Sequence, residues 1–198
     1  YDLYGRGRVS NFLKSFNLLN MYMEVDGRRL SNSDVNSLQQ SLDMKTANFT
    51  TSFNYKDIAT VSYTYYALRQ LPYAVLMDIT VTAKKDFNLG SASVMEAPDA
   101  LKDVQNYYNE IDRPHTTISL LTSTAKSPTG KLLMCASNAF IFSETHGSEP
   151  RVIHEMWDNN MHLLKFSKQL KAGETYRFSI AGSSITSAHH DDPLNEAE

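Results

Sequence analysis

The chain has 198 residues, of which 41% are hydrophobic and 21% charged, and its formal net charge is -3. This composition is that of an ordinary globular protein with enough apolar side chains to bury a core, and it excludes a disordered chain. The small, interspersed charge provides no basic stripe for phosphates, and no apolar run approaches the roughly 20 residues that cross a bilayer, so neither a nucleic-acid partner nor a membrane span is expected.

The predicted elements are almost all β-strands. The first is a hairpin, in which residues 18–25 and 28–30 flank Asp26 and Gly27, a pair that favours the positive φ angles of a tight turn. Residues 58–68 and 73–83 alternate apolar and polar side chains with the period of two of half-buried strands, and we expect Tyr63 and Tyr65 to pack in the core. Further strands are expected at residues 47–54, 87–95, 116–124, 131–142, 151–157, 162–166 and 175–184.

One segment has helical spacing. Leu101, Val104 and Tyr108 fall on one side after Pro98, which predicts a helix over residues 98–108, and the mixed sequence of residues 106–115 predicts a loop. Because nearly every other segment is a short strand, the sequence predicts an all-β fold, a supersandwich of two large antiparallel sheets with few short helices.

The end of the chain has the character of an exit from a domain. An alternating strand begins after Gly173, and the polar stretch that follows it contains Pro193 and ends in residues that favour a helix. We therefore expect a β-sandwich domain over residues 1–186 and the start of a linker over residues 187–198. The lone Cys135 lies in an apolar run, which predicts a small buried side chain. One cysteine and a first segment without a signal-peptide pattern leave the cellular compartment open.

The sequence assigns no catalytic, metal-binding or cofactor-binding residue. His189, His190, Asp191 and Asp192 are possible zinc ligands by type, but adjacent residues of an extended chain point to opposite sides, so an exposed exit loop is the better interpretation. The H-E-x-x-H spacing is absent around His146, His154 and His162, so we expect these histidines at scattered positions. We find no nucleophile elbow and no phosphate-binding loop either.

Two aromatic segments could contact a sugar, because sugars present apolar C–H faces to flat rings and hydroxyls to polar neighbours. In one segment Trp157 precedes Asp158 and Asn159, and in the other Tyr107 and Tyr108 lie among polar residues. Packing in a core or an interface is the commoner role of such side chains. These five residues are the candidate carbohydrate-binding residues.

Several segments resemble the N-terminal β-sandwich domain of glycoside hydrolase family 65. They include the strand and Asp-Gly turn of residues 20–27, the Leu42-Asp43-Met44-Lys45 element before the next strand, the hairpin of residues 58–83 and the exit after residue 186, in the same order. The resemblance implies a sandwich packed against an (α/α) helical barrel. It also implies that a glutamate of that barrel acts as general acid and that phosphate or an activated water attacks with inversion.

Two functions follow as alternatives. The resemblance implies a non-catalytic N-terminal domain of an inverting α-glycoside hydrolase or phosphorylase, which supports the barrel and shapes its sugar pocket. Its partners would be the downstream helical domain, a carbohydrate and, as a further option, a second copy in a homodimer. The alternative is a self-sufficient, lectin-like carbohydrate-binding module. The chain alone is expected to be inactive in either case.

Overall fold

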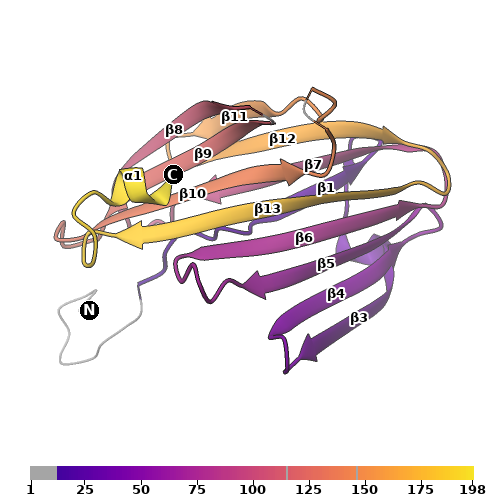
Figure 1. Cartoon of the computed structure of the whole chain (residues 1–198), viewed down its shortest axis with the longest axis horizontal. Coiled ribbons are helices and arrows are strands. Elements are labelled where there is room, and N and C mark those ends of the chain that lie inside the picture. Colours follow the sequence, from indigo (N-terminus) through magenta and orange to yellow (C-terminus); the bar gives the residue numbers. More distant parts are fainter. Residues whose placement is uncertain (1–12, 115, 146) are drawn as a thin grey trace.

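Two antiparallel β-sheets face each other in the computed structural model, which describes residues 13–114, 116–145 and 147–198 (Figure 1). The five-stranded sheet has the order β11-β12-β7-β1-β2, and the eight-stranded sheet has the order β3-β4-β5-β6-β13-β10-β9-β8. The prediction of an all-β sandwich of two large antiparallel sheets is therefore confirmed. No helix of the described segments is long and apolar enough to cross a membrane.

The smaller sheet is made of strands from three parts of the chain. Its strands are β1 (Met21–Val25), β2 (Arg28–Arg29), β7 (Phe87–Glu96), β11 (Ile153–Asp158) and β12 (Met161–Leu170). The larger sheet contains β3 (Val35–Asp43), β4 (Asn48–Tyr55), β5 (Ala59–Ala67), β6 (Ala74–Ala83), β8 (Lys102–Arg113), β9 (Thr116–Lys126), β10 (Leu133–Phe142) and β13 (Thr175–Thr186). The short helical elements are η1 (Asn32–Asp34) and α1 (Pro193–Ala197).

The alternation read from the sequence sets which face of each strand is buried. On β5 and β6, Tyr63 lies opposite Ile79 and Tyr65 opposite Met77, and all four side chains belong to or pack against the core. The intervening Thr64 points to the other face, where its hydroxyl lies 2.9 Å from that of Thr50. A one-residue slip would exchange the two faces, so the apolar alternation fixes the register of this hairpin.

An aromatic cluster joins the two sheets. Phe166 of β12 has its ring centroid 5.0 Å from those of Phe140, Phe142 and Phe178, each at a nearly perpendicular angle. Edge-to-face geometry places the positive edge of one ring against the negative face of another, which adds to the stabilisation from burial. Phe166 thus anchors the smaller sheet on β10 and β13 of the larger one.

The predicted helix over residues 98–108 is wrong, and so is the predicted loop over residues 106–115. Most of this segment forms β8, which pairs with β9 from Lys102 to Arg113. Val104 and Tyr108 are four residues apart, a spacing that fits one face of a helix and equally one face of a strand. A bulge at Asp103, with φ of 51°, also lets Leu101 face the core, and this bulge produced the three-residue spacing that imitated a helix.

Strand β3 was not expected from the sequence. It is the edge strand of the larger sheet, and all of its residues except Val35 are exposed. Without a buried face there is little selection for alternating hydrophobicity, so the strand is visible only through its pairing with β4.

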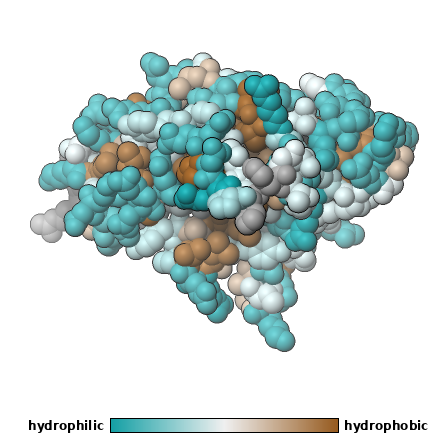
Figure 2. Space-filling view, turned by 45° about the horizontal axis from the view of Figure 1, so that its top comes forward, coloured by the Kyte–Doolittle hydropathy of each residue, from teal (hydrophilic) through white to brown (hydrophobic). Residues whose placement is uncertain are grey.

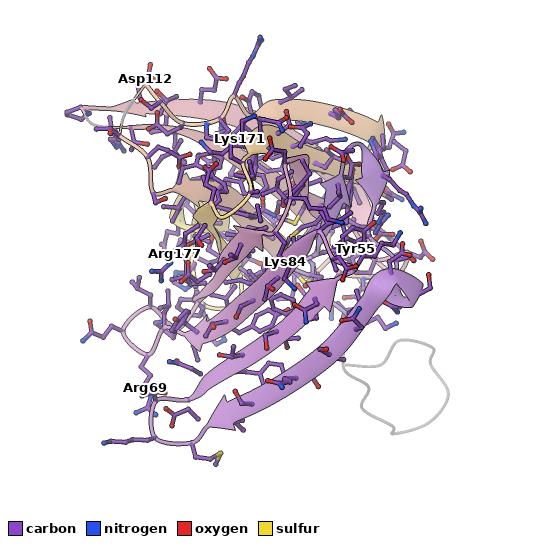
Figure 3. All side chains as sticks on the ribbon, turned by 90° about the vertical axis from the view of Figure 1, so that its right-hand side faces the viewer. Tyr55, Arg69, Lys84, Asp112, Lys171 and Arg177 are labelled. Carbon is purple, nitrogen blue, oxygen red and sulfur yellow. The ribbon has the colours of Figure 1, made fainter. Side chains whose placement is uncertain are left out.

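The turns after β4, β6 and β12 gather at one end of the sandwich, the end that faces the viewer in Figure 3. The carboxylate of Asp86 accepts a hydrogen bond of 2.8 Å from the amide of Ala172 and pairs with the Lys171 ammonium at 3.0 Å, and these contacts hold its pKa below the usual range. Lys84 donates a hydrogen bond of 2.9 Å to the side-chain oxygen of Asn54. These contacts link neighbouring turns of the two sheets.

The exit segment folds back onto the larger sheet. Leu194 and Ala197 of α1 pack on Cys135 and Ile185, on the face of β10 and β13 that points away from the core. Asp192 caps this helix by accepting a hydrogen bond from the amide of Asn195. Cys135 is buried as expected, and its burial raises the pKa of the thiol to about 11.

Replacing the anchor of the aromatic cluster tests this account of the core. Phe166 is 1% exposed, so we expect Phe166→Ala to lower the free energy of unfolding by about 4 kcal/mol. Leu71→Ala, at a turn position that is 60% exposed, should change it by less than about 0.5 kcal/mol. Urea unfolding followed by circular dichroism measures both, and equal effects of the two substitutions would contradict the assignment of the core.

Candidate functional site

A cleft of about 560 Å³ opens where the edges of the two sheets approach each other. We call it the rim cleft; the larger sheet contributes Tyr108 and Glu110 of β8 and Thr117 and Ser119 of β9, and the opposite wall includes residues 149–154. The side of the molecule presented in Figure 2 is mainly hydrophilic, with separate hydrophobic patches. The volume of the rim cleft is in the range of small-molecule sites.

One aromatic pair forms the floor of the rim cleft. The rings of Tyr108 and His154 stack in parallel, with their centroids 4.7 Å apart and 4° between their planes. The Tyr108 hydroxyl donates a hydrogen bond of 2.6 Å to Glu110 Oε1. Partial burial and this neighbouring carboxylate raise the pKa of Tyr108, so the phenol stays protonated and acts as a donor.

A chain of hydrogen bonds runs inward from this pair and joins the two sheets. Asn106 Nδ2 donates to the Asn159 carbonyl at 3.0 Å, which directs Asn106 Oδ1 toward the Ser123 hydroxyl at 2.7 Å. His162 Nε2 lies 2.7 Å from the oxygen of Ser123, and His162 Nδ1 lies 3.2 Å from His154 Nε2.

The direction of each bond in this chain follows from its fixed end. Since Ser123 uses its hydrogen for Asn106 Oδ1, its oxygen accepts from His162 Nε2–H, and His162 Nδ1 must then accept from His154 Nε2–H. His162 is 0% exposed, and its burial, with a smaller contribution from His154, lowers its pKa to about 4. Burial also lowers the pKa of His154. Both rings are therefore neutral near pH 7 and serve as a hydrogen-bonded link between the sheets.

The structure places the five predicted sugar-binding residues on different surfaces. Tyr108 lines the rim cleft, and the carbonyl of Asn159 holds Asn106 beside it. Asp158 accepts a hydrogen bond of 2.7 Å from Asn160 and thereby shapes the β11–β12 turn. Trp157 is 53% exposed, with its indole N–H 3.3 Å from Glu155, and Tyr107 points to the opposite face of β8 from Tyr108.

The prediction of scattered positions is wrong for His154 and His162, whose ring nitrogens lie 3.2 Å apart, and His146 lies outside the described residues. Sequence reasoning did not single out Ser123 or Asn106 as site residues. The signal for the two histidines was the short turn between residues 157 and 162, because a hairpin there pairs His162 with Met156 and brings His154 to the same face. Ser123 and Asn106 come from the strand pair β8–β9, whose register the helix prediction had hidden.

One histidine of the exit segment, His190, takes part in packing. His190 pairs with Glu196, and its ring meets that of Tyr73 edge to face at 4.9 Å, whereas His189, Asp191 and Asp192 are exposed. Across residues 13–114, 116–145 and 147–198, no three side chains of His, Cys, Asp or Glu are close enough to share a metal ion.

Comparisons with known proteins agree on one family. The sequence model described as "Glycosyl hydrolase family 65, N-terminal domain" matches residues 3–198. Over all 198 residues the chain is 66% identical to a kojibiose hydrolase of Mucilaginibacter mallensis and 44% identical to a kojibiose hydrolase of Flavobacterium johnsoniae. It spans 29% of the length of each.

Two solved structures share the fold at low identity. A human-microbiome protein assigned as a kojibiose phosphorylase superposes with a TM-score of 0.66 over 87% of this chain and 22% of its own, at 10% identity. Heparan sulfate lyase HepC from Pedobacter heparinus gives 0.53 over 82% and 23%, at 9% identity. These two likenesses support the sandwich architecture alone.

The neutral histidine pair predicts a pH dependence of stability. The pKa of His162 is about 4 in the folded protein, whereas an unfolded histidine titrates near pH ~6.5. The unfolded chain therefore binds the proton first, and stability should be full above pH ~6.5 and fall progressively toward pH ~4. Urea unfolding at a series of pH values measures this slope.

Two histidine substitutions separate this effect from other titrations. His162→Gln keeps a donor for Ser123 but cannot titrate, so the slope between about pH 4.5 and 6.5 should flatten, because a side chain that binds no proton in either state adds nothing to it. His189→Gln, at an exposed position, should leave the slope unchanged. An unchanged slope in His162→Gln would show that His162 is not neutral in the folded protein.

Proposed function

The chain belongs to the N-terminal domain family of glycosyl hydrolase family 65, and we propose that it is the non-catalytic domain of an enzyme that cleaves kojibiose or a related α-glucoside. The observation that carries this proposal is the 66% identity, over the whole chain, to 29% of a kojibiose hydrolase. Both relatives are hydrolases by name, which favours hydrolysis over phosphorolysis.

The chemistry of the described residues supports a structural role. His162, whose pKa is lowered to about 4, is neutral near pH 7, buried and hydrogen-bonded on both ring nitrogens. The Cys135 thiol has a raised pKa and lies under α1, so it is a weak nucleophile. In this proposal the general acid and the attacking water belong to residues that follow residue 198.

A row of apolar side chains crosses the outer face of the larger sheet. It consists of neighbours in register on β5, β6, β13, β10 and β9, namely Tyr66, Leu76, Ala181, Ala139 and Leu120. We call it the outer apolar row. Ile141, 48% exposed, lies on the same face, and a hollow of about 430 Å³ extends from Tyr66 and Leu76 to Ile141 and Arg177, which is labelled in Figure 3.

The downstream catalytic domain is the proposed cover of the outer apolar row. Glu198 lies beside it, since its carboxylate accepts hydrogen bonds from Asn109 and Thr122 of β8 and β9, and Asn109 lies opposite Leu120. Within the row the members on β5, β6 and β13 are half-buried, whereas Ala139 and Leu120 are already buried at 7% exposure, so the part left for a further domain to cover lies on β5, β6 and β13. In this proposal residues 1–186 form the sandwich, and residues 187–198 lead over its outer face toward a helical barrel.

Activity of the separated parts tests the proposal. The 198-residue chain alone should release no glucose from kojibiose, with or without added zinc or phosphate, whereas the full-length enzyme should release it. Glucose release is measured by a coupled assay. Turnover by the chain alone that scales with protein and survives purification would contradict the proposal. A glycan bound by the isolated chain and lost in Trp157→Ala would support the lectin-like alternative instead.

The docking face has its own test. Leu76→Asp places a charge in the outer apolar row, so in the full-length enzyme it should lower the melting temperature by several degrees, as expected when a charge is buried without a partner. In the isolated chain the same change should reduce self-association in sedimentation experiments.

Thr80→Asp is the matched control, because Thr80 lies on the same face of β6 in a row of polar neighbours. It should alter neither property. Equal effects of the two substitutions would exclude the outer apolar row as the docking face. Hydrogen exchange should also show β6 and β13 protected when the downstream segment is supplied as a separate chain.

A further inference from the structure

A second cleft, of about 680 Å³, opens between the two sheets at the edge opposite the rim cleft. The smaller sheet ends there in β2, a strand of two residues, so β3, β4 and β5 extend beyond it and their inner faces are only partly covered (Figure 1). We call this space the inter-sheet cleft. Its walls are the β1–β2 hairpin with the segment before it and the inner faces of β3, β4 and β5.

The lining of the inter-sheet cleft is polar but almost uncharged. Among its described residues Arg29 is the one charged side chain, and its guanidinium lies over the ring of Tyr22, 4.3 Å from the centroid. The other polar side chains are carboxamides, hydroxyls and phenols: Asn17, Asn20, Ser31, Asn32, Gln40, Thr51, Tyr22, Tyr63 and Tyr65. Such groups both donate and accept hydrogen bonds, as a ligand rich in neutral hydroxyls requires.

Aromatic rings form the wall on the larger sheet. Tyr63 meets Tyr65 nearly at a right angle, with their centroids 5.6 Å apart, and meets Phe53 at 71°. Tyr63 and Tyr65 are half-buried, and no described residue makes a hydrogen bond with either hydroxyl. Burial raises the pKa of Tyr65, so its phenol remains a donor. Two rings at right angles offer a flat apolar surface beside a polar edge.

The rim cleft differs in charge. Its lining includes the charged side chains of Glu110, Glu149 and Arg151, and the hydroxyl of its tyrosine, Tyr108, is already bonded to Glu110. A ligand there would have to match opposite charges at close range. The inter-sheet cleft therefore has the lining suited to an uncharged ligand.

We propose that the inter-sheet cleft binds a short neutral saccharide. The ring of Tyr65 packs against the C–H face of a pyranose, and the hydroxyls of Tyr63 and Tyr65 and the carboxamide of Gln40 bind its hydroxyl groups. Gln40 is held in place by its hydrogen bond of 3.4 Å to Thr51, a residue that is 1% exposed. This inference does not depend on the proposed function.

Maltose serves as the neutral probe, and a sulfated disaccharide of the same length is the charged control. Hydrogen exchange of the full-length protein should show that maltose protects peptides covering residues 48–67, and that the sulfated sugar does not. Titration of the 198-residue chain by calorimetry gives the affinity of the same site.

Variants of one strand separate binding from folding. We expect Tyr65→Ala to weaken maltose binding about tenfold, the ratio that corresponds to the loss of ~1.4 kcal/mol, and Tyr63→Phe to weaken it severalfold through loss of the hydroxyl alone. Tyr66→Phe is the matched control, because Tyr66 lies on the same strand and points to the opposite face, and it should leave binding unchanged. Tyr63→Phe keeps the ring, so a normal melting temperature is expected for it.

Three outcomes would overturn the proposal. They are protection confined to residues 142–154, equal binding of the sulfated disaccharide, and unchanged maltose affinity in both Tyr65→Ala and Tyr63→Phe. This experiment measures saccharide binding and not cleavage of kojibiose. A failure of the saccharide-site proposal is therefore distinguishable from a failure of the proposed function.

Discussion

Five strands face eight in this sandwich, and the smaller sheet cannot cover the inner surface of the larger one from edge to edge. The aromatic cluster around Phe166 fixes where the two sheets meet, over β10 and β13 near the middle of the larger sheet. The strands on either side of this contact must find other partners for their inner faces. The inter-sheet cleft and the rim cleft lie in these two regions, one on each side of the core.

The polar contacts differ between the two sides of the core. On the β8–β9 side the sheets are joined by the chain from Asn106 through Ser123 to His162 and His154, in which each donor has an acceptor. A satisfied buried network of this kind orders its members, because any displaced group would lose a partner in a medium of low polarity. On the β3–β5 side the link is a pair of ion pairs at the surface, in which Asp34 contacts Arg28 of β2 at 3.2 Å and Lys56 after β4 at 3.1 Å. Phenols and carboxamides face an open space there instead, which is the arrangement of a binding surface.

The strands that have one buried face could be predicted from the sequence, because apolar and polar residues alternate in them with a period of two. Residues 58–68 and 73–83 are the clearest examples, and their register follows from that period. The sequence could not predict β3, whose two faces are both exposed, or β8, where the bulge at Asp103 changes the spacing of apolar residues. For the same reason, only part of the candidate site could be predicted from the sequence. Tyr108 could be chosen as an aromatic residue among polar ones, but its partner His154 lies on a strand of the other sheet.

The outer apolar row shows most clearly what a linear sequence hides. Each of its strands contributes a single residue, so no segment of the chain has an unusual composition, and only the pairing register assembles Tyr66, Leu76, Ala181, Ala139 and Leu120 into one band. Strand β5 contributes to this band through Tyr66 and to the inter-sheet cleft through Tyr63 and Tyr65, because successive side chains of a strand point to opposite faces. The proposed docking face and the proposed saccharide site are therefore two sides of the same layer of backbone. Because they use different side chains, each can be removed by substitution while the other side is left intact.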